Sequence, residues 1–172
     1  AFDGVLSFNP ANNFTVGDSP YAVALADLNG DGLVDAIAAN TESDSSSILI
    51  GNGDGTLGAP INFNSGAFQF NPFFRVGPIA VTTADFNQDG NPDFATANNI
   101  SNNISVHLRT DNTFASTRFG TGTNPGSIAA GDFNQDGNPD IVTANYTGDD
   151  ISLLLGDGAG KFGAATAFDL GA

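Results

Sequence analysis

The chain has 172 residues, with 19 acidic residues against four basic ones and a formal net charge of −15. This length allows one domain with a substantial core. The acidic charge argues against nucleic-acid partners and anionic membrane surfaces, both of which need clustered basic residues. Cysteine is absent, so disulfides and thiol chemistry are excluded. No apolar stretch approaches the roughly 20 residues of a membrane helix, so we expect no membrane insertion.

The chain divides into a short leading segment and three repeats. Residues 1–18 are expected to hold a leftover outer strand, because their Phe-rich part resembles the strand that ends each later repeat. The repeats are predicted at 19–63, 77–119 and 124–171. Each opens on a proline seven residues before an acidic nine-residue pattern, at Pro20, Pro78 and Pro125.

Each repeat is predicted to contain four short strands. Small and β-branched residues flank the acidic pattern, which makes the pattern a hairpin connection between the first two strands. A third strand contains Ser47, Ser105 or Ser152, and a Phe-rich fourth strand follows. Glycine-rich segments at 51–55 and 156–160 are predicted to be hairpin turns, since no helix follows that could hold a phosphate. Four strands in each repeat of about 50 residues predict an all-β fold made of antiparallel β-propeller blades.

The acidic pattern is the part of each repeat that carries chemistry. It reads D-x-N-x-D-G-x-x-D, and we number its positions 1 to 9 and name its copies loop 1 (27–35), loop 2 (85–93) and loop 3 (132–140). Alternating carboxylate and amide oxygens on a chain that turns at glycine suit Ca²⁺, which takes six to eight oxygen ligands. Polar turns without metal are the plainer interpretation, but three copies with the same spacing favour a cation site. We therefore predict three calcium ions, one per repeat.

The predicted ligands follow from this numbering. Positions 1, 3, 5 and 9 would bind through side-chain oxygens, and position 7 through its backbone carbonyl, which is why its side chain varies. An EF-hand is excluded because its glutamate at position 12 is missing. Three bound ions would reduce the net charge from −15 to −9. The predicted metal ligands are Asp27, Asn29, Asp31, Leu33 and Asp35 in loop 1, Asp85, Asn87, Asp89, Asn91 and Asp93 in loop 2, and Asp132, Asn134, Asp136, Asn138 and Asp140 in loop 3.

The repeats resemble a known family. Each proline, acidic loop and following Ala-Asn, and then the S-x-L-L-x-G-x-G-x-G-x-F run, are similar to the FG-GAP/VCBS-type repeat of integrin α propellers and of bacterial secreted proteins. Phe119-Gly120 and Phe162-Gly163 match the motif that names the family. The resemblance implies calcium-binding propeller blades and metal at the loop residues named above. The binding partners of the family are too varied to be inferred for this chain.

Only three repeats are present, whereas propellers have typically four to eight blades. We therefore expect a homo-oligomer or a head-to-tail filament through the terminal strands, with a fragment of a longer protein as the alternative. No catalytic arrangement is evident, and the single histidine, His107, is expected to be a packing or surface residue. Acids outside the loops could form a second metal site or a ligand rim, although solvated loop acids are commoner: Glu42, Asp44, Asp149 and Asp150.

These observations predict a non-catalytic, extracellular calcium-binding module that serves adhesion, surface display or self-assembly through a protein or glycan ligand. The extracellular location is preferred because calcium is abundant there. Two alternatives remain open: a calcium-dependent carbohydrate-binding lectin, and an accessory domain of a larger secreted hydrolase.

Overall fold

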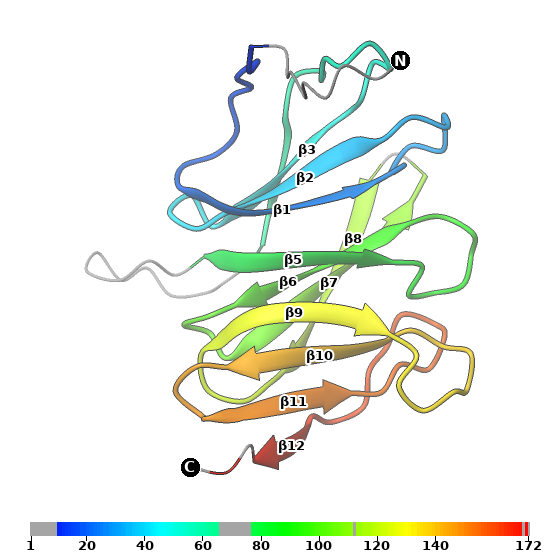
Figure 1. Cartoon of the computed structure of the whole chain (residues 1–172). Helices are drawn as coiled ribbons and strands as arrows, with labels where there is room; N and C mark the ends of the chain where they lie inside the picture. Colours follow the sequence, from blue (N-terminus) through cyan, green and yellow to red (C-terminus); the bar gives the residue numbers. More distant parts are fainter. Residues whose placement is uncertain (1–9, 66–76, 112, 170, 172) are drawn as a thin grey trace, which may run out of the picture.

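The computed structural model describes residues 10–65, 77–111, 113–169 and 171. Twelve strands in these ranges form three four-stranded antiparallel sheets, which we call sheets 1, 2 and 3 in chain order (Figure 1). The predicted all-β blade architecture is confirmed. The same ranges contain no helix, and therefore none long enough to cross a membrane. The strands are β1 (Pro20–Ala26), β2 (Asp35–Asn40), β3 (Ser45–Leu49), β4 (Ile61–Asn64), β5 (Pro78–Ala84), β6 (Asp93–Asn98), β7 (Asn103–Thr110), β8 (Thr113–Gly120), β9 (Pro125–Gly131), β10 (Asp140–Asn145), β11 (Asp150–Leu154) and β12 (Thr166–Asp169).

Each acidic loop joins the first and second strands of its sheet, as the sequence predicts. Position 9 is also the first residue of the second strand, where it pairs with the last residue of the first strand. These closing pairs are Ala26 with Asp35, Ala84 with Asp93, and Gly131 with Asp140. Because the register is the same in all three sheets, the loops occupy equivalent places.

The connection between the third and fourth strands differs between sheet 2 and the other two sheets. In sheets 1 and 3 the glycine-rich segments turn as predicted, and an isolated bridge closes each turn, Gly51 with Leu57 and Gly156 with Phe162. Sheet 2 lacks this turn, because β7 and β8 pair continuously as far as Thr110 and Thr113. The Phe-rich part of the predicted leading strand lies outside the described residues, and residues 10–18 form no strand.

The sheets stack face to face along the chain, with the first strands β1, β5 and β9 side by side (Figure 1). Between sheets 1 and 2 the core contains Leu28, Ile37, Ile48 and Phe94. Between sheets 2 and 3 it contains Phe86, Val106 and Ile141 among others. Sheet 2 thus uses one face to pack on sheet 1 and the other to pack on sheet 3.

A buried asparagine ends the second strand of each sheet, on the side away from the acidic loops. Its amide group donates two hydrogen bonds to side chains at the start of the third strand. Asn145, for example, donates to Asp150 Oδ1 at 2.6 Å and to Ser152 Oγ at 2.8 Å. The equivalent donors in sheets 1 and 2 are Asn40 and Asn98.

The carbonyl oxygen of this asparagine is paired in only two of the sheets. Thr143 Oγ1 donates to Asn145 Oδ1 at 3.0 Å, and Thr96 makes the equivalent contact in sheet 2. Sheet 1 has Ala38 at that position, and Asn40 Oδ1 is buried without a partner in the described part of the chain. A buried acceptor without a donor costs free energy, so this site in sheet 1 is built less favourably.

We predict that Thr143→Val lowers the free energy of unfolding by about 1–2 kcal/mol, because it keeps the shape but leaves Asn145 Oδ1 without a donor. Ala38→Thr is expected to raise it by about 0.5–1 kcal/mol relative to Ala38→Val. The added atoms have room, since Ala38 lines a surface hollow of about 210 Å³. Urea denaturation measures both effects. Equal stability of the Thr and Val variants at residue 38 would show that the asparagine oxygen needs no donor.

Candidate metal centres

The three acidic loops lie along one side of the molecule, at the right in Figure 1. Loops 2 and 3 contact each other directly: Gln88 Nε2 donates to the carbonyl of Gly137 at 2.8 Å and to Asn138 Oδ1 at 2.9 Å. Arg109, in β7, connects loops 1 and 2. Its guanidinium donates to the carbonyl of Asn29 at 2.7 Å and to Asn91 Oδ1 at 3.2 Å. The acidic loops therefore form a contiguous row.

Two left-handed residues give each loop its curvature. The glycine at position 6 has φ of 83°, 86° and 87° in loops 1, 2 and 3, which confirms the predicted turn. Position 4 is also left-handed: it is Gly30 in loop 1, but Gln88 and Gln135, with φ of 56° and 62°, in the other two. Left-handed backbone is unfavourable for a residue with a Cβ, so surrounding contacts must hold these two glutamines in place.

Backbone N–H groups gather the side-chain oxygens of positions 1, 3 and 5. In loop 1, Asp27 Oδ1 accepts from Gly30 and Asp31, and Asp27 Oδ2 accepts from Gly32. Asn29 Oδ1 accepts from the same Asp31 N–H at 2.9 Å. Apart from the position 4 contact, loops 2 and 3 repeat these bonds. In all three loops the position 3 amide also donates to Oδ2 of position 5.

Position 9 is placed differently from the other three. Its carboxylate is fully buried, and each oxygen accepts a backbone N–H. Asp35 Oδ2 accepts from Leu28 and Oδ1 from Gly51, both at 2.8 Å. Asp93 and Asp140 make the same two contacts. The residue therefore fastens its loop to the end of the third strand. Each oxygen has further lone pairs, so its role as a ligand stays a prediction.

The electrostatics of the loops favour a bound cation. Backbone N–H groups inside the loops are the main cause of lowered pKa values for Asp27, Asp89 and Asp136. Burial raises the pKa of Asp93 to about 6, and the nearby charges of Asp89 and Asp85 add to the rise. The three carboxylates of loop 2 thus repel one another, and a divalent ion would relieve that repulsion.

The donor set of each loop fits a hard cation such as Ca²⁺, because it consists of carboxylate and amide oxygens held on a short, sharply curved segment. Within the described ranges no three acidic or histidine side chains form a preassembled cluster. In each loop the side-chain amide of the position 3 asparagine, rather than a third carboxylate, faces the carboxylate of position 5. Positions 1, 3 and 5 are therefore the residues that the structure brings together, while the position 7 carbonyls of Leu33, Asn91 and Asn138 remain predicted ligands.

Arg109 is the loop contact that sequence reasoning missed. It takes the place of Gly51 and Gly156, and like them it donates its backbone N–H to the position 9 aspartate, Asp93. Its side chain then reaches loop 1, whose residue Asn29 is 80 positions away in sequence. The only available signal was a basic residue at a site where the other two repeats have glycine.

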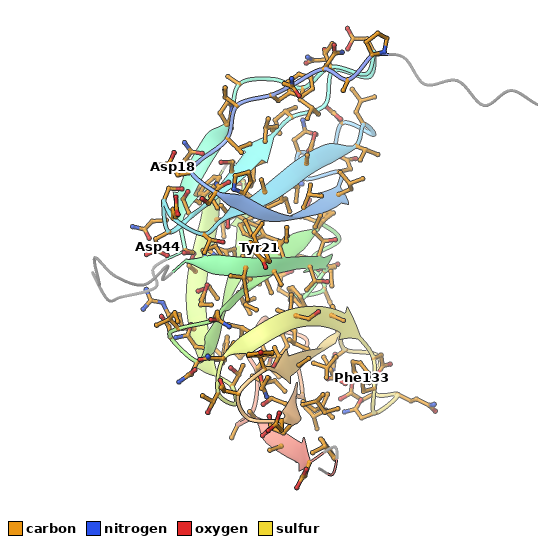
Figure 2. All side chains as sticks on the ribbon, turned by 60° about the vertical axis from the view of Figure 1, so that its left-hand side comes forward. Asp18, Tyr21, Asp44 and Phe133 are labelled. Carbon is orange, nitrogen blue, oxygen red and sulfur yellow. The ribbon has the colours of Figure 1, made fainter. Side chains whose placement is uncertain are left out.

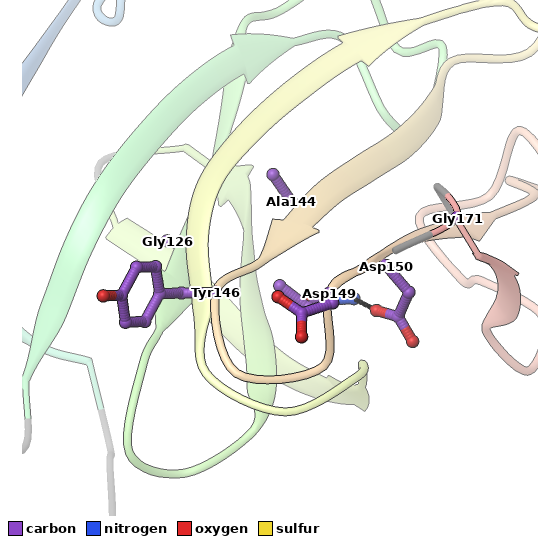
Figure 3. Close-up of a pocket in the computed structure, with 7 residues that line it drawn as sticks. Gly126, Ala144, Tyr146, Asp149, Asp150 and Gly171 are labelled. Atoms are coloured by element: carbon purple, nitrogen blue, oxygen red, sulfur yellow. Dashed lines mark hydrogen bonds between the residues drawn. The ribbon is translucent and has the colours of Figure 1, made fainter.

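The remaining candidates have packing or surface roles. His107 is fully buried and stacks on Phe94 with ring centroids 4.3 Å apart, and burial lowers its pKa to about 4. Among the acids outside the loops, Asp150 binds Asn145, and it lines with Asp149 a surface hollow of about 530 Å³ on sheet 3 (Figure 3). Neither arrangement combines a nucleophile, a base and an orienting group.

Comparisons with solved structures agree with the propeller-like arrangement of the sheets. Two crystal structures of BBS1N in complex with ARL6DN, one soaked with lead and one with mercury, each superpose with a TM-score of 0.50 at 14% identity. The matches cover 95% and 96% of this chain but only 60% and 62% of those chains. This chain thus spans about three fifths of their length, and the likeness concerns the fold alone. A comparison with curated proteins gave no match.

Comparison with protein families covers the three repeats. The FG-GAP-like repeat family matches residues 27–96 and 85–143, and the FG-GAP repeat family matches residues 124–168. The matched segments include all three acidic loops and at least two strands of every sheet. The chain therefore belongs to the FG-GAP repeat family.

Proposed function

We propose that this chain is a calcium-binding, non-catalytic module that holds one ion in each acidic loop. The observation that carries the proposal is the recurrence of one arrangement at positions 1, 3 and 5 in loops 1, 2 and 3. A single acidic turn could be a surface feature, but three loops with equivalent hydrogen bonds and register indicate a common ligand. Carboxylates and amides supply the oxygen donors that Ca²⁺ prefers.

The bound ions would have a structural role. Each loop connects the two innermost strands of its sheet, and the row of loops is joined through Arg109 and Gln88. An ion that neutralises the loop carboxylates stabilises the folded state, because the unfolded chain offers no comparable site. Bound metal would therefore stiffen the row of acidic loops on one side of the three sheets.

We place this module outside the cell, where it would serve adhesion or surface display. FG-GAP repeats are commonly extracellular, and weak calcium sites stay filled at the calcium levels found there. The absence of an assembled catalytic group in the described residues supports a binding role for the module.

Isothermal titration with calcium tests the proposal. We expect three ions per chain for the wild-type protein and two for Asp136→Ala, which removes the exposed position 5 carboxylate of loop 3. A matched control is Asp157→Ala, which removes an exposed acid from a glycine-rich turn and should leave three sites. Absence of binding by the wild-type protein at millimolar calcium would refute the proposal.

A further inference from the structure

Within the described ranges the two end sheets each leave one face without a partner, and this is visible when equivalent positions are compared. In sheets 1 and 2, one face packs on the following sheet, and the small residues Ala39 and Ala97 on that face are fully buried. The equivalent residue of sheet 3, Ala144, is exposed. We call this face of sheet 3 the tail face; register pairing adds to it Val142, Ile151, Leu153 and Phe168.

The second position of the acidic loops shows the same difference more strongly. Leu28 and Phe86 are 4% and 1% exposed, because each packs against the sheet that follows. Phe133, at the same position in loop 3, is 53% exposed. A large aromatic side chain is therefore left in solvent at the one loop that has no following sheet (Figure 2).

Sheet 1 presents the complementary half of the contact. In sheets 2 and 3 the first strand packs on the preceding sheet, and Ile128 is only 9% exposed. Val23, the equivalent residue of β1, is 66% exposed, and Tyr21 and Leu25 beside it are 69% and 62% exposed. These three residues alternate along β1 and share one face, to which Pro20 is adjacent. We call this set the head face.

Polar contacts fix how one sheet meets the next. Thr41 Oγ1 donates to the carbonyl of Pro78 at 2.9 Å, and Asn99 Nδ2 donates to that of Pro125 at 3.4 Å. Both of these prolines are buried, whereas Pro20 is exposed. In sheet 3 the residue equivalent to the donors Thr41 and Asn99 is Tyr146.

Tyr146 is 82% exposed and lies at the rim of the 530 Å³ hollow on the tail face (Figure 3). The hollow also includes Gly126 and Ala144, and it occupies the place where Thr41 and Asn99 receive the next proline. The tail face therefore has both an apolar surface and a recess where the start of another first strand would fit.

We infer that the tail face of one copy of this chain packs on the head face of a second copy. The occupant is a second copy because the two faces are the separated halves of a contact that the chain already makes twice, between sheets 1 and 2 and between sheets 2 and 3. The recess on the tail face is lined by Asp149 and Asp150, and the head-face residues Pro20, Tyr21, Val23 and Leu25 bring no like charge against them. Such pairing is heterologous, so it closes a ring or continues as a filament.

This contact differs from pairing through the terminal strands, because it uses sheet faces rather than strand edges. It also uses no loop ligand, so its failure is distinguishable from the failure of metal binding. The test uses two charge substitutions on exposed residues, Val23→Asp on the head face and Ala144→Asp on the tail face. A matched control is Ile100→Asp, which places the same charge on an exposed apolar residue in the turn between β6 and β7.

Light scattering after size exclusion at about 100 µM protein gives the mass of each sample. We expect a dimer or larger for the wild type and Ile100→Asp, and monomers for the two face variants. A mixture of the face variants should form a 1:1 dimer, because each supplies the face that the other lacks. Circular dichroism confirms that each variant is folded, and Val23→Thr replaces Val23→Asp if it is not.

Three outcomes would overturn the inference. A monomeric wild type would do so, and would leave the hollow to another ligand such as a saccharide. An oligomer that survives both face substitutions would place the interface elsewhere. Two monomeric variants that fail to combine would show that the contact does not run from head to tail.

Discussion

Chelation of calcium is expected to lower the midpoint of thermal unfolding by roughly 20 °C, since three sites filled at a hundred times their Kd contribute about 8 kcal/mol. The loop carboxylates repel one another without a cation, and this repulsion acts in the folded chain, where the charges of Asp89 and Asp85 help to raise the pKa of Asp93. Differential scanning calorimetry in millimolar calcium and in excess chelator measures the difference.

Asp136→Ala separates this effect from a general loss of stability. In calcium the variant should melt several degrees below the wild-type protein, because one of three sites is lost. In chelator the two proteins should melt within a degree or two of each other, because the exposed carboxylate has no ion to bind. The same loss in both conditions would mean that Asp136 stabilises the fold without metal.

Replacing Asp35 by alanine is expected to reduce stability even in chelator, by about 2–6 kcal/mol, because two backbone donors lose their buried acceptor. These donors are the N–H groups of Leu28 and Gly51, each 2.8 Å from one carboxylate oxygen. The loss would detach loop 1 from the end of β3. Urea denaturation in the presence of chelator gives the value.

Two further variants define the origin of that loss. Asp31→Ala removes an exposed carboxylate from the same loop and should have little effect in chelator. Asp35→Asn keeps one acceptor but turns an amide N–H toward a backbone N–H, so its loss should approach that of Asp35→Ala. If Asp35→Ala and Asp31→Ala were equally mild in chelator, position 9 would have no fastening role.

The strands and loop turns were predictable because they depend on local sequence. Pro20, Pro78 and Pro125 fix the start of each repeat, and the glycine at position 6 is the residue that tolerates a left-handed turn. The alternation of small and β-branched residues on both sides of each loop then requires a hairpin. All these signals lie within about 20 residues of one another.

The features that were not predictable depend on contacts between distant residues. Asp35 and Gly51 are 16 positions apart, and the sequence alone gives the aspartate only a ligand's role. Arg109 reaches Asn29 across 80 positions. Gln88 adopts left-handed backbone in a loop that also contacts loop 3, a conformation that its residue type does not favour. Local conformational propensities of the residues do not predict such long-range pairings.

The stacking of the sheets in chain order determines how stability is distributed. Sheet 2 packs against a neighbour on both faces, whereas sheets 1 and 3 each have one such neighbour in the described part of the chain. The free energy of such an array approximates a sum of unit terms and nearest-neighbour coupling terms. Fraying of an end unit therefore removes one coupling term, whereas disruption of the central unit removes both and uncouples the other two. The cooperativity of unfolding of the three sheets therefore depends mainly on sheet 2.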